Sequence, residues 1–152
     1  MIKDVIIKAL KKNTDERGFL IEAWRADWGE IFFSPHMSYV SFTFYNKTRG
    51  PHEHKHQTDY FIFGPFGTFA LYLWDNRQNS PTFNISMTVH GGEDSPVLVI
   101  VPPGVIHGYK CVSEKGGIVF NQPDSLYRGA GGKGKVDEIR HENDPHSKFI
   151  IP

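Results

Sequence analysis

The sequence of 152 residues contains a single cysteine, Cys111. One cysteine cannot close an internal disulfide bond, which excludes a secreted scaffold stapled by its own disulfides. The residues around Cys111 are mostly apolar, and this setting favours a buried structural thiol over a nucleophile. We therefore expect the chain to work in a reducing compartment, and we place it in the cytoplasm.

The chain also lacks an excess of charge and a long apolar run. Its 17 Lys and Arg residues balance its 17 Asp and Glu residues, so it has no net attraction for nucleic acid or an anionic membrane. No apolar run approaches the ~18 residues of a membrane-spanning helix. The N-terminal stretch Met1–Lys8 is too charged for a signal peptide. We predict neither a nucleic-acid partner nor a membrane partner.

Aromatic residues, glycine and proline are abundant, with 12 Phe, 6 Tyr, 3 Trp, 15 Gly and 10 Pro. This composition favours strands and tight turns over helices. The stretch Ser38–Tyr45 alternates small or polar residues with bulky ones, as a half-buried strand does. Thr68–Trp74 places Phe69, Leu71 and Leu73 on one face, and Val97–Val101 is wholly apolar, as in a strand buried on both sides.

Short strand patterns separated by turn residues continue along the chain. Asp59–Phe63 reads as a strand ending at a turn over 64–67, Asn46–Gly50 reads as a turn, and a short strand is expected from Tyr109. The tail over 136–145 is expected to hold a helical turn. About nine or ten strands without a linker predict one all-β domain over residues 1–152, either a barrel or a double-sheet jelly roll.

Histidines gather in one short stretch of the chain. His52, His54 and His56 are spaced two apart, so an extended backbone would point all three to one face. Imidazoles grouped in this way are costly to bury without partners. A second stretch, Pro102–His107, ends in another histidine after a proline-glycine turn. We expect His52 and His107 to project into one cavity.

Three imidazoles and a carboxylate form a ligand set that suits a divalent transition metal. The set is His52, His54, Asp59 and His107, and its spacing resembles the two short motifs of cupins, with Asp59 where glutamate is usual. The alternative is a substrate pocket lined by these histidines without a metal. His56 is expected at the surface or at the pocket rim.

A larger set of motifs occurs in the order found in one family of enzymes. The chain resembles the dTDP-4-dehydrorhamnose 3,5-epimerases, sugar-nucleotide enzymes of cupin fold. The motifs are Asp15-Glu-Arg17-Gly18-Phe19-x-x-Glu22, Arg49-Gly-Pro-His52, Ser80-Pro-Thr-Phe83, Pro102-Pro-Gly-x-x-His107-Gly-Tyr and Asn143-Asp144-Pro145. The resemblance implies a cupin-type double-stranded β-helix, or jelly-roll barrel, with short peripheral helical turns.

The resemblance also implies roles for particular residues. His52 resembles the general base that removes a proton next to the 4-keto group of the sugar, and Asp144 resembles the carboxylate that orients it. Arg17 and Arg49 resemble arginines that bind the pyrophosphate, and His107 resembles a pocket histidine near the sugar. No cofactor is required under this hypothesis. A homodimer is implied, with an N-terminal strand completing the sheet of the neighbour.

The chain departs from the family at the position of its catalytic tyrosine, which carries Phe120, and at the position of its lysine, which carries Asp59. Tyr127 is a candidate stand-in for the tyrosine, with packing or stacking as its alternative role. Glu22 is a candidate pocket acid, with a surface role as its alternative. His54 stands where the family has glutamine, so two changes together move the site toward a metal-binding pattern. A divalent ion at the enolate oxygen could replace the lysine and the tyrosine.

Three hypotheses follow from these motifs. The first is an epimerase or isomerase of a nucleotide-linked, dTDP-type 4-keto-6-deoxy sugar, for which the two departures argue against full 3,5-epimerisation. The second is a metal-dependent cupin of another reaction class. The third is a non-catalytic sugar-nucleotide binder.

Overall fold

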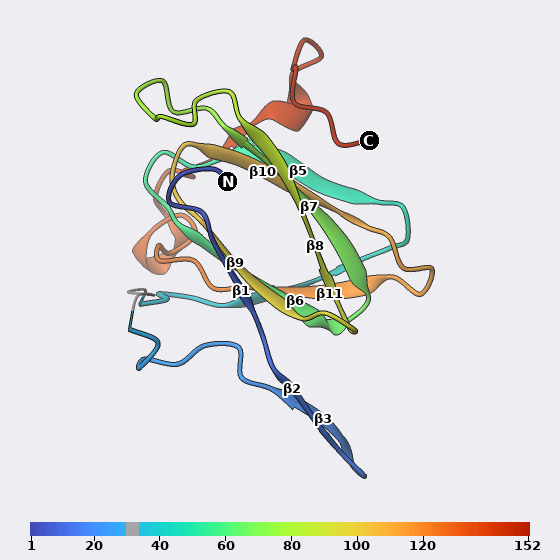
Figure 1. The fold of residues 1–152 in the computed structure, drawn as a ribbon. Coiled ribbons are helices and arrows are strands. Elements are labelled where there is room, and N and C mark those ends of the chain that lie inside the picture. Colours follow the sequence, from blue (N-terminus) through green and yellow to red (C-terminus); the bar gives the residue numbers. More distant parts are fainter. Residues whose placement is uncertain (30–33) are drawn as a thin grey trace.

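The computed structural model describes residues 1–29 and 34–152 of the chain. Two five-stranded sheets face each other, and a separate two-stranded hairpin projects from them (Figure 1). Every strand pair is antiparallel. The helices of the described ranges are two short 3₁₀ turns, η1 (Ala130–Gly132) and η2 (His141–Asn143). The predicted jelly roll with peripheral helical turns is confirmed.

The two sheets differ in strand order, and both combine segments far apart in the sequence. The first sheet has the order β1 (Ile6–Ala9), β9 (Val97–Val101), β6 (Asp59–Phe66), β11 (Gly117–Asn121) and β4 (Tyr39–Thr43). The second sheet has the order β12 (Ile139–Arg140), β5 (Thr48–Glu53), β10 (Val105–Cys111), β7 (Thr68–Asp75) and β8 (Ser86–Gly92).

The space between the sheets is filled by the inner core. Phe69, Leu71 and Leu73 of β7 all belong to it, so the predicted inward face of this strand is confirmed. Strand β6 contributes Phe61 and Phe63 to the same core. Burying these side chains supplies much of the stability, at roughly 25 cal/mol for each Å² of apolar surface removed from water.

A second apolar cluster covers the outer face of the first sheet. Tyr60, Ile62 and Leu98 lie in it, and Trp24 and Phe120 pack against it. Strands β6 and β9 therefore bury both faces, which explains why their sequences are continuously apolar instead of alternating. Because Phe120 packs against this outer cluster, its side chain lies on the outer face of β11, away from the inner core.

Three of the predicted strand boundaries were wrong. Strand β6 continues to Phe66, β5 begins at Thr48 within the predicted turn, and β10 begins at Val105 instead of Tyr109. Strand β10 is longer because it pairs with two neighbours: Val105 lies opposite Asp75, and His107 lies opposite both Leu73 and His52. Tertiary pairing thus extends the chain where local turn signals suggested a break.

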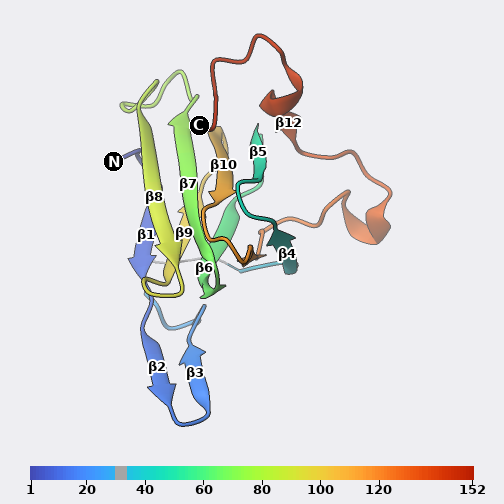
Figure 2. The ribbon, with the colours of Figure 1, turned by 90° about the vertical axis from the view of Figure 1, so that its right-hand side faces the viewer.

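The hairpin consists of β2 (Lys12–Asp15) and β3 (Gly18–Ile21) and extends away from the two sheets (Figure 2). It carries the exposed side chains of Phe19 and Leu20. Apolar groups on a projecting hairpin are suited to contact with another protein surface. No helix in the part of the chain described is long and apolar enough to cross a membrane.

Candidate active site

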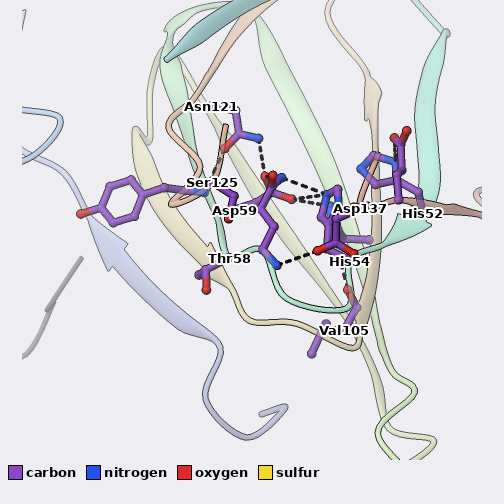
Figure 3. Close-up of polar contacts among 12 residues, drawn as sticks. His52, His54, Thr58, Asp59, Val105, Asn121, Ser125 and Asp137 are labelled. Carbon is purple, nitrogen blue, oxygen red and sulfur yellow. Dashed lines mark hydrogen bonds and ion pairs between the residues drawn. The ribbon is translucent and has the colours of Figure 1, made fainter. Parts of the chain in front are cut away.

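The site lies between the sheets, where several strands begin or end. His52 of β5 is the register partner of His107 of β10, and their ring centroids are 4.5 Å apart. In the other sheet, Asp59 is the first residue of β6 and Asn121 is the last residue of the neighbouring strand β11. Figure 3 shows His54 directed toward Asp59 at this end of the molecule. His52 and His107 are therefore neighbours, as predicted, but His107 is buried and, of the two, only His52 lines the cavities at this site.

Gly50 allows β5 to approach β10 closely beside the site. Its φ of +82° lies in the left-handed region, and a Cβ at this position would come within 2.7 Å of the carbonyl oxygen of His107. An L-residue would be strained by both the φ value and the contact. This glycine of the Arg-Gly-x-His motif thus allows the two histidine-bearing strands to pack closely against each other.

The carboxylate of Asp59 is the centre of the site. Its Oδ2 atom lies 3.0 Å from His54 Nε2 and 3.1 Å from His107 Nε2. Its Oδ1 atom accepts hydrogen bonds from Asn121 Nδ2 at 2.7 Å and Gln57 Nε2 at 3.0 Å. Burial raises the pKa of this carboxyl, but the facing rings of His107 and His54 outweigh burial and lower it. Asp59 is therefore ionised.

Backbone carbonyls fix the rings of His54 and His107. A carbonyl oxygen can only accept, so His54 Nδ1 donates to the carbonyl of Asp137 and His107 Nδ1 donates to the carbonyl of Val105 at 3.0 Å. Both rings consequently direct Nε2 toward Asp59. Burial lowers the pKa of His54, whereas the close contact with the carboxylate of Asp59 and its charge raise it, and the net value is about 9.

His52 has a different environment from the other two histidines. Its Nδ1 atom lies 3.8 Å from Glu138 Oε1, and its side chain is partly exposed, at 18%. Burial and then the charges of His107 and His54 lower the pKa of His52 to about 2. The ring is thus unprotonated at neutral pH. An imidazole that lines a cavity and lies beside a carboxylate is placed to take a proton from a bound substrate.

The structure does not bring Asp144 to His52. Asp144 is exposed, and its Oδ1 atom accepts a hydrogen bond from the backbone amide of His146. Arg140 of β12 is the register partner of His52, which sets Glu138 beside the ring. Glu138 therefore corrects the predicted partner, because the pairing of β12 with β5 brings in an earlier part of the tail.

Two cavities meet at His52. One has a volume of about 430 Å³ and is also lined by Tyr39, His54, Tyr127 and Glu138. The other, about 440 Å³, is lined by Tyr39, Arg49 and His52 among others. Both volumes lie within the usual range for small-molecule sites. Of the predicted substrate residues, Arg49 and Tyr127 line these cavities.

Tyr39 was not predicted as a site residue, although it lines both cavities with His52. It begins strand β4, and its hydroxyl accepts a hydrogen bond from Asn121 Nδ2 at 2.8 Å. Burial, and then the charge of Asp59, raise its pKa, so the phenol keeps its proton at neutral pH. The alternating pattern of Ser38–Tyr45 predicted the strand but did not indicate which face would meet the site.

Basic side chains of the C-terminal part also went unpredicted. Arg128, Lys135 and Arg140 line the first cavity, and Arg140 lines the second as well. The spacing of these residues carries no motif, and they meet only because the tail folds back along β5. They are side chains of the kind that bind phosphate groups, although Arg140 is also paired with Glu138 and Glu142.

Three further residues singled out in the sequence line neither of these cavities. Arg17 is on the hairpin, where its exposed side chain pairs with Asp15. Glu22 pairs with Arg25. His56 is exposed because β5 ends at Glu53 and the period-two alternation stops there. The four residues of the metal hypothesis do converge: one potential ligand atom from each of His52, His54, Asp59 and His107 lies within 4.8 Å of all the others.

A jelly roll with a base, phenols and cationic groups around one cavity defines a class of enzyme suited to proton transfer on an anionic small molecule. The model of the family described as dTDP-4-dehydrorhamnose 3,5-epimerase matches residues 1–138. The chain belongs to this family.

Relatives agree with this assignment. The chain is 35% identical over 127 residues to a Haloferax volcanii protein, "Probable low-salt glycan biosynthesis epimerase Agl13", covering 83% of this chain and 81% of the relative. It is 34% identical over 114 residues to the spore coat polysaccharide biosynthesis protein SpsL of Bacillus subtilis, covering 75% and 74%.

The fold is also that of a solved structure, a dTDP sugar isomerase from Desulfovibrio desulfuricans, with a TM-score of 0.85, 22% identity and coverage of 98% of this chain and 91% of that one. The family and the relatives favour an epimerase over a metal-dependent cupin of another reaction class and over a non-catalytic binder.

Proposed function

We propose that this protein epimerises a dTDP-linked 4-keto-6-deoxy sugar, with His52 as the general base. The observation that carries the proposal is the position of His52, which lines both cavities and whose Nδ1 atom lies 3.8 Å from Glu138 Oε1. The family's printed activity supplies the substrate class.

The chemistry begins with a C–H bond next to a ketone. Such a proton is weakly acidic, so the base and the groups that stabilise the enolate must be in place beforehand. His52 takes the proton and becomes a cation. Glu138 stabilises that cation and orients the ring through Nδ1, the role predicted for Asp144.

A proton must then return to the opposite face of the carbon. Tyr39 keeps its phenolic proton and lines the cavities that His52 faces. Phe120 cannot replace it, because this side chain packs in the outer cluster. We assign proton return to Tyr39, and we keep Tyr127 as a substrate-binding residue at the wall of the first cavity.

The nucleotide diphosphate is assigned to the cationic side of the cavities. Arg49, Arg128, Lys135 and Arg140 line them, and guanidinium groups bind phosphate oxygens in pairs. Arg49 already donates to Thr43 Oγ1 and to the carbonyl of Phe42, which holds its side chain in position.

Arg17 remains a proposed ligand of the pyrophosphate only in a homodimer. Within one chain it is on the projecting hairpin, and the hairpin reaches outward as an element that pairs with a neighbour would (Figure 2). Strand β4 is an edge strand whose exposed Val40 and Phe42 offer an apolar face. We propose a homodimer in the cytoplasm in which the hairpin of each chain reaches the partner.

Solvent deuterium incorporation tests the function. A dTDP-4-keto-6-deoxy sugar incubated with the protein in D₂O should gain deuterium at C3, C5 or both, and magnetic resonance of the sugar identifies the carbon. His52→Ala should slow incorporation by about 10²–10⁴-fold, while His56→Ala, at an exposed site, should retain the wild-type rate. Absence of incorporation in the wild type across a panel of such sugars would contradict the proposal.

A further inference from the structure

Beside the catalytic base, three potential ligand atoms lie close together in a buried position. His54 Nε2, His107 Nε2 and Asp59 Oδ2 are the atoms concerned, and the side chains are 9%, 2% and 1% exposed. Both Nδ1 atoms already carry the proton that they donate to backbone carbonyls. Nε2 is thus the atom of each ring that faces Asp59, and a metal ion bound there would displace any proton on it.

The contacts to Asp59 Oδ2 are short but do not have the geometry of hydrogen bonds. Oδ2 and His107 Nε2 are buried, and neither has a hydrogen-bond partner among the described residues, although they are only 3.1 Å apart. These buried atoms therefore lie close together without a hydrogen bond that satisfies them in the described part of the chain. A buried polar atom in this state is costly unless something else satisfies it.

Neighbouring ligands around one ion have this arrangement. Each lone pair then points at the ion and not at the adjacent ligand. With bonds of roughly 2.1 Å, ligand atoms at right angles are roughly 3.0 Å apart, which agrees with the 3.0 Å and 3.1 Å from Asp59 Oδ2 to the two nitrogens.

The surrounding hydrogen bonds are also those of a ligand set. Metal-bound histidines usually donate their second nitrogen to a carbonyl or carboxylate, and metal-bound carboxylates are themselves hydrogen-bonded. Here the two Nδ1 atoms donate to carbonyls, and Asp59 Oδ1 accepts from Asn121 and Gln57. The Gln57 amide also lies 3.2 Å from His54 Nε2, and an ion bound to that nitrogen would take the place of this contact.

We propose that His54, Asp59 and His107 hold one divalent first-row transition-metal ion at the floor of the catalytic cavity, with His52 left free. Two imidazoles and one carboxylate are a ligand set that such ions accept while keeping further positions open. His52 is excluded from the set because its ring is not fixed by a backbone carbonyl, is more exposed, and faces both cavities. An ion there would supply positive charge near the substrate ketone.

Metal binding is tested on the untagged full chain without any sugar, so the result does not depend on the proposed reaction. Chelator-treated protein is dialysed against Zn²⁺ or Co²⁺ and then analysed for metal. We expect about one ion per chain in the wild type and in His52→Ala. The affinity should fall at least about 100-fold in His54→Ala, whereas His56→Ala, two residues along the chain, should bind as the wild type does.

Two further measurements distinguish loss of the metal site from misfolding of a variant. Asp59→Asn keeps the acceptor of the Asn121 bond and should also lose the ion, with its fold checked by circular dichroism. Anomalous diffraction from Co²⁺-soaked wild-type crystals should place the ion within bonding distance of His54, Asp59 and His107.

The outcomes separate this site from the epimerase proposal. A wild type that retains no ion, a His54→Ala variant that binds as well as the wild type, or an anomalous peak elsewhere would overturn the metal site. Loss of the ion in His52→Ala would overturn the three-residue set. If His52→Ala loses deuterium incorporation but keeps its ion, both the base and the separate metal site are supported.

Discussion

Replacing Glu138 with glutamine tests the base and its partner most directly. The substitution keeps the size of the side chain and removes its charge. His52 gains a positive charge when it takes the proton, and its Nδ1 lies 3.8 Å from Glu138 Oε1. At this separation two unit charges attract by about 4 kcal/mol at an effective dielectric constant of about 20, and by about 1 kcal/mol in bulk water.

Arg140 moderates the effect, because it holds the other oxygen of Glu138 at 2.8 Å. The cavity is also open to solvent, so the loss should lie between these limits. We expect a decrease of about 100-fold in the rate of deuterium incorporation for Glu138→Gln, that is about 2.7 kcal/mol. The measurement is the initial rate in D₂O with saturating dTDP-4-keto-6-deoxy sugar.

Asp144→Asn is the matched control. Its carboxylate is exposed and serves only a local turn in the described chain, so the variant should stay within about threefold of the wild type. The reasoning fails if Glu138→Gln is as active as the wild type, or if Asp144→Asn loses as much activity as Glu138→Gln. The second result would restore the dyad predicted from the sequence.

Three other predictions concern proton return, acid stability and packing. Tyr39→Phe should reduce net epimerisation by about 10²-fold with less effect on deuterium incorporation, and equal losses in both assays would contradict its role. The bonds of Asp75 to Arg77, Ser80 and Thr82 outweigh burial and lower its pKa, so Asp75→Asn should lower the free energy of unfolding by about 2–4 kcal/mol at neutral pH. Since the pKa of Asp75 is lowered on folding, this contribution is present above about pH 4 and disappears in acid; urea titrations that keep the full difference in acid would refute it. Leu98→Ala, in a fully buried position of β9, should cost about 3 kcal/mol, and a loss under about 1 kcal/mol would show that the outer cluster is loosely packed.

Local patterns in the sequence predicted the strands of the core. Val97–Val101 is apolar throughout and is buried on both faces, and Thr68–Trp74 alternates as its inner face requires. The boundaries near the site were less accurate. Strand β10 extends back to Val105 because it has partners on both sides, and no local signal reports a partner distant in the sequence.

The sequence by itself determined the family, the jelly roll and the candidate histidines, since motif order and residue periodicity are properties of the chain alone. The tertiary structure decided which side chains meet. The pairing of β12 with β5 put Glu138, and not Asp144, beside His52, and the register of β4 turned Tyr39 into the cavities. A contact between distant segments depends on strand register, where a shift of one residue reverses the face that every side chain presents.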